Sequence, residues 1–357
     1  MSAHRPETIM GWDVGGAHLK VSWLDAEGHL LGVRQEPCSL WRGLPQLHAA
    51  LDAVLQREHL PMPLAHGVTM TGEMADLFTD RNEGVRALVD VMTQHLGNRR
   101  LGFYGGDAGW LMAAAAKARP QVAASCNWHA SARALAPRLG AALFVDMGST
   151  TTDIVPIAAT EVRAQGLRDS DRLALGELVY SGVARTPLMA LAPSAPVGER
   201  RIPLMAELFA TTADIYRILG WLPEGADQQP SADGAPKTVA ASRQRLARMV
   251  GCDAHEQSDE TWDALAAWFA DTQLDALERA ARQVLQRVGL PEDAPMVAAG
   301  VGSFVVERLA HRLGRQVWPY AAALGLAAPD HDPLQAHWAS WCAPAVAVAL
   351  LYREYRA

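Results

Sequence analysis

Ile9-Met10-Gly11-Trp12-Asp13-Val14-Gly15-Gly16-Ala17-His18-Leu19-Lys20-Val21 combines an apolar run, an Asp, a glycine-containing turn and a second apolar run. The same order recurs in Ala142-Leu143-Phe144-Val145-Asp146-Met147-Gly148-Ser149-Thr150-Thr151-Thr152-Asp153-Ile154-Val155. Each pattern predicts a strand, a tight turn and a second strand. Glycines let the N–H groups of a turn approach an anion closely. One such hairpin is a weak signal, but two of them predict the two halves of a phosphate clamp.

Within this clamp, two carboxylates are predicted to lie at strand ends. Asp13 and Asp146 are the candidate Mg²⁺ ligands, since carboxylates hold this ion directly or through water. Capping of the turns is the alternative role for both. The turn residues predicted to bind phosphate are Gly15, Gly16, Gly148, Ser149, Thr150 and Thr151.

Two charged residues follow the turns. Lys20 either pairs with phosphate as a point charge or is a solvated lysine of the strand, and the sequence leaves both roles open. Asp153 has three open roles, since it can orient a water on the metal, act as a base or cap the turn. Both residues are retained as catalytic candidates.

A third motif contains Gly300 and Gly302 between a predicted strand and a predicted helix. Gly-x-Gly alone is weak, because the third glycine of a dinucleotide fingerprint is missing. Taken in this order, the three motifs resemble the sugar kinase, Hsp70 and actin superfamily. The third motif resembles its adenosine loop, which makes Gly300 and Gly302 candidate nucleotide-binding residues. The resemblance implies an α/β fold of two lobes, with mixed sheets flanked by helices and a ligand cleft between the lobes. It also implies Mg²⁺ as a cofactor, with ATP or ADP as a further ligand left open.

The length of 357 residues suggests two domains. We expect an N-terminal lobe over residues 1–140, completed by a C-terminal helix at 343–355, and a second lobe over 141–342. Apolar periodicity predicts further helices, among them Leu44–Arg57 and Trp110–Arg119. The polar break 224–237 has the composition of a mobile surface loop.

Charge and cysteine content narrow the class of protein. The net charge is −7 and no dense Lys/Arg run occurs, which argues against nucleic-acid binding. Arg243, Arg245 and Arg248 are expected on a solvated helix face, with a role in holding an anionic substrate as the alternative. Four scattered cysteines without a Cys-x-x-Cys pair argue against a zinc site or disulfide framework and suit a reducing cytosol.

The sequence also gives expectations for the cellular location and the oligomeric state of the protein. The segment Met1–Glu7 has no apolar signal core, and no apolar run reaches the length of a membrane span. We therefore expect a cytoplasmic protein with no membrane partner. A homodimer is compatible with the sequence, which leaves the oligomeric state open.

Further strings narrow the resemblance. They are Thr69-Met70-Thr71-Gly72-Glu73-Met74-Ala75-Asp76-Leu77-Phe78, Arg81-Asn82-Glu83-Gly84-Val85, Ala124-Ser125-Cys126-Asn127-Trp128-His129-Ala130, Gly176-Glu177-Leu178-Val179-Tyr180-Ser181-Gly182-Val183 and Glu207-Leu208-Phe209-Ala210-Thr211-Thr212-Ala213-Asp214. They resemble hydantoinase A/oxoprolinase-like proteins tied to tetrahydromethanopterin-linked C1 transfer, a group similar to the archaeal methanofuran-biosynthesis synthase. The resemblance covers about residues 9 to 352.

What this resemblance implies is a transferase of methanofuran- or methylofuran-type cofactor biosynthesis. Such an enzyme joins an aminomethylfuran-methyl diphosphate to the phenol of γ-glutamyltyramine and releases diphosphate. The small-molecule partners are therefore a diphosphate and a phenolic acceptor. Ala17 supports this departure from kinase chemistry, because typical superfamily kinases carry a Thr or Ser hydroxyl at that position.

Candidate residues for the phenol lie outside the clamp. Glu73 is the first candidate for the base that takes the phenol proton; a helix N-terminal Glu stabilised by the dipole is the alternative. Asn127, Trp128 and His129 are candidates for one wall of a site that binds a ring substrate. The alternative is that Trp128 is packed in the protein and that His129 has its hydrogen bonds satisfied there. Tyr180 is expected to contact substrate or to belong to the core. An ATP-dependent kinase or ATPase of the same fold, and a non-catalytic nucleotide-binding protein, remain alternative functions.

Overall fold

The computed structural model describes residues 8–57, 64–326 and 333–356. Met1–Glu7, where we expect no signal sequence, lies outside the described residues. The chain divides into two compact units. Unit 1 consists of Met1–Gly140, Ile157–Val162 and Pro319–Ala357, and unit 2 consists of Ala141–Pro156 and Arg163–Trp318.

Unit 1 contains a six-stranded mixed sheet in the order β3-β2-β1-β4-β5-β6. The first three strands form an antiparallel meander, and β4 and β5 run parallel to β1. The strands are β1 (Thr8–Val14), β2 (His18–Leu24), β3 (Leu30–Pro37), β4 (Leu64–Met70), β5 (Leu101–Tyr104) and β6 (Trp110–Leu111); the short strand β9 (Glu161–Val162) also falls in unit 1.

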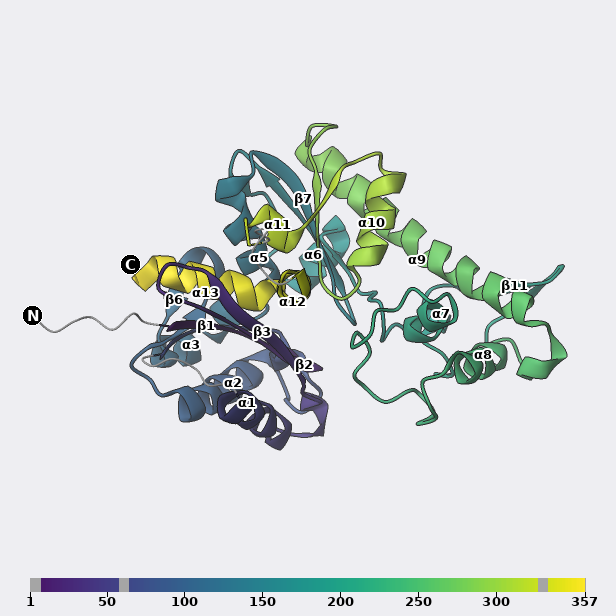
Figure 1. Ribbon diagram of the computed structural model, residues 1–357, viewed down its shortest axis with the longest axis horizontal. Helices are drawn as coiled ribbons and strands as arrows, with labels where there is room; N and C mark the ends of the chain where they lie inside the picture. Colours follow the sequence, from purple (N-terminus) through teal and green to yellow (C-terminus); the bar gives the residue numbers. More distant parts are fainter. Residues whose placement is uncertain (1–7, 58–63, 327–332, 357) are drawn as a thin grey trace, which may run out of the picture. The chain divides into compact units, whose positions relative to one another are not determined.

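Helices flank this sheet (Figure 1). They are α1 (Pro45–Arg57), α2 (Arg81–Leu96), α3 (Ala113–Ala118), α4 (Pro120–Ala123), α5 (Asn127–Leu135), α11 (Tyr320–Ala323), α12 (Pro333–Trp341) and α13 (Ala343–Arg356), with short 3-10 helices η1 (Leu40–Arg42), η2 (Gly72–Met74), η3 (Gly106–Ala108) and η4 (Ala136–Arg138). The predicted helix Trp110–Arg119 is wrong at its start. Trp110 lies in β6 and pairs with Tyr104, so the helix begins only at Ala113.

The C-terminal helix α13 lies against the strands of this sheet (Figure 1). A Cβ atom at Gly11 would lie 2.0 Å from the carbonyl oxygen of Ala345, and one at Gly67 would lie 2.8 Å from that of Val348. The hydroxyl of Ser22 donates to the carbonyl of Ala345 at 3.1 Å. Glycines on β1 and β4 therefore let the helix backbone approach the sheet directly.

The boundary of unit 1 differs from the predicted one. Residues 319–342 were expected in the second lobe, but they group with unit 1. The backbone N–H of Ala321 donates to the Ser340 hydroxyl at 3.1 Å, and the Tyr320 hydroxyl donates to the Ser131 carbonyl at 3.2 Å. These contacts attach α11 and α12 to α5.

Unit 2 contains a second mixed sheet in the order β10-β8-β7-β13-β14, with β13 parallel to β7. Its strands are β7 (Ala141–Met147), β8 (Thr152–Ala158), β10 (Leu178–Val179), β13 (Met296–Ala299) and β14 (Val317–Pro319), and β11 (Ser194–Val197) pairs separately with β12 (Arg200–Pro203). Its helices are α6 (Asp169–Leu175), α7 (Thr212–Ile218), α8 (Val239–Arg248), α9 (Asp259–Val288) and α10 (Ser303–Arg312), with 3-10 helices η5 (Leu188–Ala190) and η6 (Ala254–Glu256).

No single helix in the described ranges has the length and hydropathy of a membrane span, although α12 and α13 meet that test as a bent pair.

Candidate functional site

The first turn, Gly15–His18, joins β1 to β2. It is closed by a hydrogen bond from the N–H of Gly15 to the carbonyl of His18 at 3.0 Å. Two carbonyls of the turn are held from the segment after β3, because Leu40 donates to Gly16 and Cys38 donates to Ala17, each at 2.9 Å. A Cβ at Gly16 would meet no atom within 4 Å, so the turn has open space beside it.

The second turn, Gly148–Thr151, repeats this construction in unit 2. The N–H of Gly148 donates to the carbonyl of Thr151 at 2.9 Å. The carbonyls of Gly148 and Ser149 accept N–H groups from the segment after β10, at 2.8 to 3.1 Å; the donors are Val183, Ala184 and Arg185.

The two turns present backbone donors. Among the described residues, none accepts a hydrogen bond from the N–H of Gly16, Ser149 or Thr150. Successive N–H groups of this kind form concave sites for anions. Each predicted half of the phosphate clamp therefore has the donors that phosphate oxygens require.

The carboxylate of the first hairpin has an ammonium group beside it. Asp13 is buried and pairs across the sheet with Lys20, whose Nζ lies 3.6 Å from Oδ2 of Asp13. Lys20 keeps 18 % of its side chain exposed. Lys20 therefore lies beside the first turn, where both of its predicted roles remain open.

The carboxylates of the second hairpin lie in a different setting. Asp146 is buried at the end of β7. Asp153 occupies the position that Lys20 has in the first hairpin, two residues after the turn. Its Oδ1 accepts a hydrogen bond from Nη1 of Arg172 at 2.8 Å, and Nη2 of Arg172 donates to the Glu177 carbonyl at 2.9 Å. Arg172, on α6, is 2 % exposed and is a residue that sequence reasoning missed.

The predicted nucleotide loop packs directly on the second hairpin. The N–H of Gly302 donates to the Met147 carbonyl at 2.8 Å. Gly300 has a φ of +80°, and a Cβ there would lie 2.2 Å from the Met147 carbonyl oxygen and 2.4 Å from Oδ1 of Asp146. Only glycine fits this position, because both its conformation and its space exclude a side chain.

The segment 176–183 packs against the second turn. A Cβ at Gly182 would lie 2.4 Å from the backbone N of Thr150, so this glycine allows the segment to contact the turn. The Thr152 hydroxyl donates to the Ser181 carbonyl at 2.7 Å, and the Gln273 amide donates to the Gly182 carbonyl at 2.9 Å. Tyr180 is 63 % exposed, which excludes it from the core and leaves the substrate role as a prediction.

In unit 1, Glu73 lies close to the first turn. It follows the end of β4, where the N–H of Thr71 donates to the Val14 carbonyl at 2.9 Å. Glu73 is 1 % exposed, and its Oε1 accepts a hydrogen bond from the Ser125 hydroxyl at 2.5 Å. A Cβ at Gly84 would lie 2.4 Å from the Glu73 carbonyl oxygen, so α2 rests on the Glu73 backbone.

The proposed substrate wall begins two residues after Ser125. Trp128 and His129 are buried, while Asn127 is half-buried at the start of α5. Nδ1 of His129 lies 2.9 Å from the Tyr104 hydroxyl, and its Nε2 lies 3.4 Å from Asp107. Burial raises the pKa of Tyr104. His129 therefore has partners within the protein at both ring nitrogens, and a substrate role of this wall stays a prediction.

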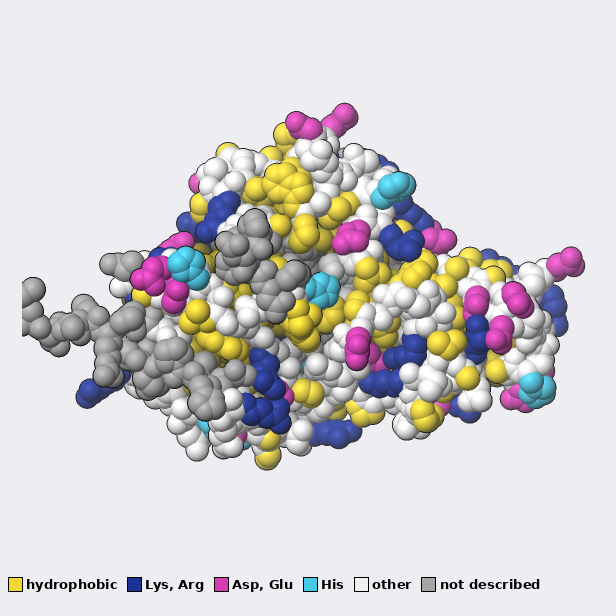
Figure 2. Space-filling model, viewed as in Figure 1, with side chains coloured by type: hydrophobic (Ala, Val, Ile, Leu, Met, Phe, Trp, Pro, Cys, Tyr) yellow, Lys and Arg dark blue, Asp and Glu magenta, His cyan; other side chains and the backbone are white. Residues whose placement is uncertain are grey.

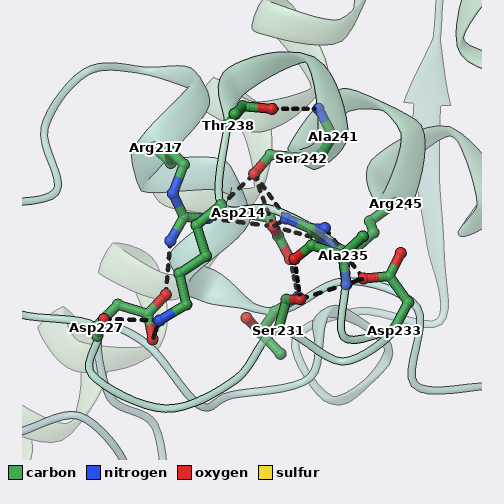
Figure 3. A network of polar contacts seen from close by, with 12 residues as sticks. Asp214, Arg217, Asp227, Ser231, Asp233, Ala235, Thr238, Ala241, Ser242 and Arg245 are labelled. Atoms are coloured by element: carbon green, nitrogen blue, oxygen red, sulfur yellow. Dashed lines mark hydrogen bonds and ion pairs between the residues drawn. The ribbon is translucent and has the colours of Figure 1, made fainter.

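Figure 3 shows a second polar network in unit 2, between α7, α8 and the loop 224–237. Arg245 is fully buried, and its Nη2 lies 2.7 Å from Oδ1 of Asp214. Arg217 and Lys237 both reach Asp227, at 2.6 and 3.2 Å. The expectation of a solvated face is thus wrong for Arg245, because sequence periodicity did not reveal its partner Asp214. The loop that we expected to be mobile is attached through Asp227.

The other two arginines of this cluster lie near the surface. Arg243 pairs with Asp259 and Asp263, and Arg248 pairs with Asp233. On the face drawn in Figure 2, Lys and Arg side chains are interspersed with Asp and Glu over α8 and α9. This mixture gives no uniformly basic surface there.

The donor set suits Mg²⁺ and phosphate, as each hairpin offers a buried carboxylate beside backbone N–H donors. Among the described residues, the group of three that meets metal-ligand spacing is a different one, the largely exposed Asp25, Glu27 and His29. Three exposed or half-exposed side chains in one hairpin loop do not by themselves make a metal site.

Comparison with known proteins bears on family and fold. The hydantoinase/oxoprolinase family model matches residues 65–328. The (4-{4-[2-(gamma-L-glutamylamino)ethyl]phenoxymethyl}furan-2-yl)methanamine synthase of Methanocaldococcus jannaschii is 28 % identical over 300 residues, which cover 84 % of this chain and 87 % of that protein. The protein of the same name from Methanococcus vannielii is 29 % identical over 165 residues, covering 46 % and 72 %.

The solved structure of nucleotide-free acetone carboxylase, described as part of the mechanism of ATP-dependent acetone carboxylation, is similar in fold. It has a TM-score of 0.56 and 10 % identity, covering 90 % of this chain and 70 % of that one. Together with the two sheets, this likeness confirms the predicted fold class, an α/β fold of mixed sheets flanked by helices. The resemblance to the sugar kinase, Hsp70 and actin superfamily stays a prediction. The ligand cleft between the lobes stays a prediction.

Proposed function

Since the chain belongs to the hydantoinase/oxoprolinase family, as the sequence predicted, we propose that it is a transferase of furan-cofactor biosynthesis. Its substrates are an aminomethylfuran-methyl diphosphate and the phenol of γ-glutamyltyramine, and its products are an aryl-alkyl ether and diphosphate. The observation that carries the proposal is the match to the archaeal synthase over 87 % of that protein's length.

The proposed reaction forms two bonds and breaks two. The phenol oxygen forms a bond to the furan-methyl carbon, and the bond from that carbon to the diphosphate oxygen breaks. The electron pair of that bond leaves with diphosphate, and the phenol proton passes to Glu73. Charge develops on the leaving group, so preorganised donors aimed at it lower the barrier.

The chain's own residues have distinct tasks in this scheme. The N–H groups of Gly16, Ser149 and Thr150 would bind diphosphate oxygens, and Asp13 and Asp146 would hold Mg²⁺. When bound, the ion neutralises charge on the leaving group. Ala17 is buried within the first turn and offers no hydroxyl, which supports a reaction other than ordinary γ-phosphoryl transfer.

The alternative is an ATP-dependent kinase or ATPase. Gly300 and Gly302, packed on the second hairpin, favour it, because a strand that ends in glycines before a helix resembles the adenosine loop of the sugar kinase, Hsp70 and actin superfamily. A non-catalytic nucleotide-binding protein is the third candidate.

The deciding experiment incubates the protein with Mg²⁺, the furan-methyl diphosphate and γ-glutamyltyramine, with and without ATP. We expect ether product by mass spectrometry and released diphosphate in equal amounts, both independent of ATP. Consumption of ATP with a phosphorylated small molecule as product would establish the kinase alternative instead.

The clamp is tested separately by calorimetry. Asp13→Asn and Asp146→Asn are expected to weaken Mg²⁺-dependent diphosphate binding by roughly 10- to 100-fold, because each removes an anionic oxygen ligand. Circular dichroism serves as the control for folding. Unchanged affinity in both variants would exclude the clamp.

A further inference from the structure

Ser125 has an unusual backbone conformation. Its φ is +50°, in the left-handed region that side chains other than glycine rarely adopt. It lies between the end of α4 at Ala123 and the start of α5 at Asn127. Such a strained conformation persists where the surrounding structure enforces it, often at functional sites.

The conformation directs the Ser125 hydroxyl to one atom. Its Oγ donates to Oε1 of Glu73 at 2.5 Å, across 52 residues of sequence. The Glu73 backbone is held on the other side by α2 at Gly84. The carboxylate is therefore restrained both through its backbone and through one of its two oxygens.

The same segment is fixed at its C-terminal side. His129, four residues after Ser125, contacts the Tyr104 hydroxyl and Asp107. The start of α5 is thus anchored to the end of β5, while Glu73 follows β4, the neighbouring strand. Ser125 connects two adjacent strand ends, which is where open α/β sheets bind ligands.

We infer that Ser125 is a positioning residue for Glu73. Its hydroxyl holds Oε1, so that Oε2 is the oxygen that receives the phenol proton when the ether bond forms. The hydroxyl itself keeps its own proton and takes no part in bond making. This inference rests on the proposed role of Glu73 as the base.

The test compares four variants in the ether-forming assay. Ser125→Ala removes the hydroxyl and keeps a Cβ in the left-handed conformation, whereas Ser125→Gly removes the hydroxyl and relieves that conformation. Ser131→Ala is the matched control, because it removes a buried hydroxyl from α5, the helix that follows Ser125, where this hydroxyl donates to the Asn127 carbonyl. Glu73→Gln removes the base.

We expect both Ser125 variants to lower kcat roughly 10- to 100-fold, with less than about a twofold change in KM for the diphosphate substrate. The acidic limb of the pH–rate profile moves to higher pH, because a hydrogen bond that stabilises the carboxylate is gone. Ser131→Ala retains the wild-type rate. Ser125→Gly has a higher Tm than Ser125→Ala, since the strain is removed.

A double-variant cycle decides whether Ser125 acts through Glu73. Ser125→Ala in the Glu73→Gln background is expected to cause no further loss of kcat. The inference is overturned if Ser125→Ala keeps the wild-type rate, or if it lowers the rate equally in both backgrounds.

A measurement without turnover separates this inference from the proposed function. The infrared carboxylate band of Glu73, identified by difference from Glu73→Gln, should shift in Ser125→Ala and stay in place in Ser131→Ala. An unshifted band contradicts the contact whatever reaction the enzyme performs. If the wild type turns over ATP instead of forming ether, the same variants are assayed on that reaction, and an unchanged rate overturns the positioning role.

Discussion

The first and second turns have the same pattern of backbone hydrogen bonds, but the hairpins that contain them carry different charged residues. Both are closed by a hydrogen bond from a glycine N–H to the carbonyl three residues later. In both, the carbonyl that precedes the turn's first glycine, on Val14 or Met147, accepts an N–H from the segment after the next parallel strand, on Thr71 or Gly302. The residue two positions after the turn is Lys20 in the first hairpin and Asp153 in the second.

This difference shows how each turn balances its carboxylates. The first hairpin does so locally, because Lys20 lies across the strand from Asp13 and reaches solvent. The second hairpin carries Asp146 and Asp153, and depends on Arg172 from a separate helix. The first turn's charge balance is therefore built into its hairpin, whereas the second turn's requires tertiary structure.

The largest expected effect comes from removing the two cations. Arg172→Met should lower the free energy of unfolding by about 3–5 kcal/mol, because it breaks a buried ion pair. Lys20→Met should cost about 1 kcal/mol or less, since its ammonium is 3.6 Å from Asp13 and partly solvated. Urea unfolding followed by circular dichroism measures both. Equal losses would remove the distinction between the hairpins.

A second test measures how the free energy of unfolding depends on acidic pH, through a residue next to the first hairpin. Burial lowers the pKa of His66, on β4 beside the first hairpin, to about 4. Its Nδ1 accepts a hydrogen bond from Trp12, which requires the neutral ring. The unfolded chain binds the proton more readily, so this contribution is complete above about pH 6.5 and is lost as the pH falls toward 4.

The loss amounts to about 3 kcal/mol for a shift of this size. It is measured as the difference in unfolding free energy between wild type and His66→Gln across that pH range. The glutamine variant keeps an acceptor for Trp12 and cannot titrate. Parallel curves for the two proteins would show that His66 contributes nothing to acid sensitivity.

The third test concerns space beside the turns. Gly182→Ala places a Cβ 2.4 Å from the backbone of the second turn, and Gly16→Ala places one in open space. The first change should cost about 1–3 kcal/mol and weaken diphosphate binding, whereas the second should leave stability within about 0.5 kcal/mol. Thermal unfolding and calorimetry distinguish them. A stable Gly182→Ala protein with normal binding would mean that the turn adjusts.

The smallest effect concerns the thiol next to the first turn. Burial raises the pKa of Cys38 to about 12. Because the thiolate is the reactive form, alkylation of Cys38 at pH 8 should be roughly 100-fold or more slower than in the unfolded chain. Mass spectrometry of labelled peptides measures this, with the half-buried Cys126 as an internal reference. Fast labelling of Cys38 in the native protein would mean that the segment after β3 opens.

The sequence predicted the parts that depend on local pattern. Apolar runs around Asp13 and Asp146 predicted both hairpins, and the glycines at 300 and 302 predicted a strand-to-helix loop. The family and the fold class were also predicted. These features depend on residues close together in the chain, where periodicity and turn chemistry are informative.

Partners that come from distant segments could not be predicted. Nothing local to Arg172 indicates Asp153, and nothing local to Arg245 indicates Asp214. The charged pattern of α6 resembles that of an exposed helix, although Arg172 is buried. For Ser125, the quoted string marked the segment, but its left-handed backbone and its contact with Glu73 follow only from tertiary packing.

The packing of α13 on Gly11 and Gly67 has a consequence for the order of synthesis. Ser22 and its partner Ala345 are 323 residues apart. At roughly 5–20 residues per second, the ribosome needs on the order of tens of seconds to proceed from one to the other. Throughout that interval the glycine face of the first sheet has no helix upon it, while every residue of unit 2 emerges. All residues of unit 2 are therefore synthesised before the residues that complete unit 1.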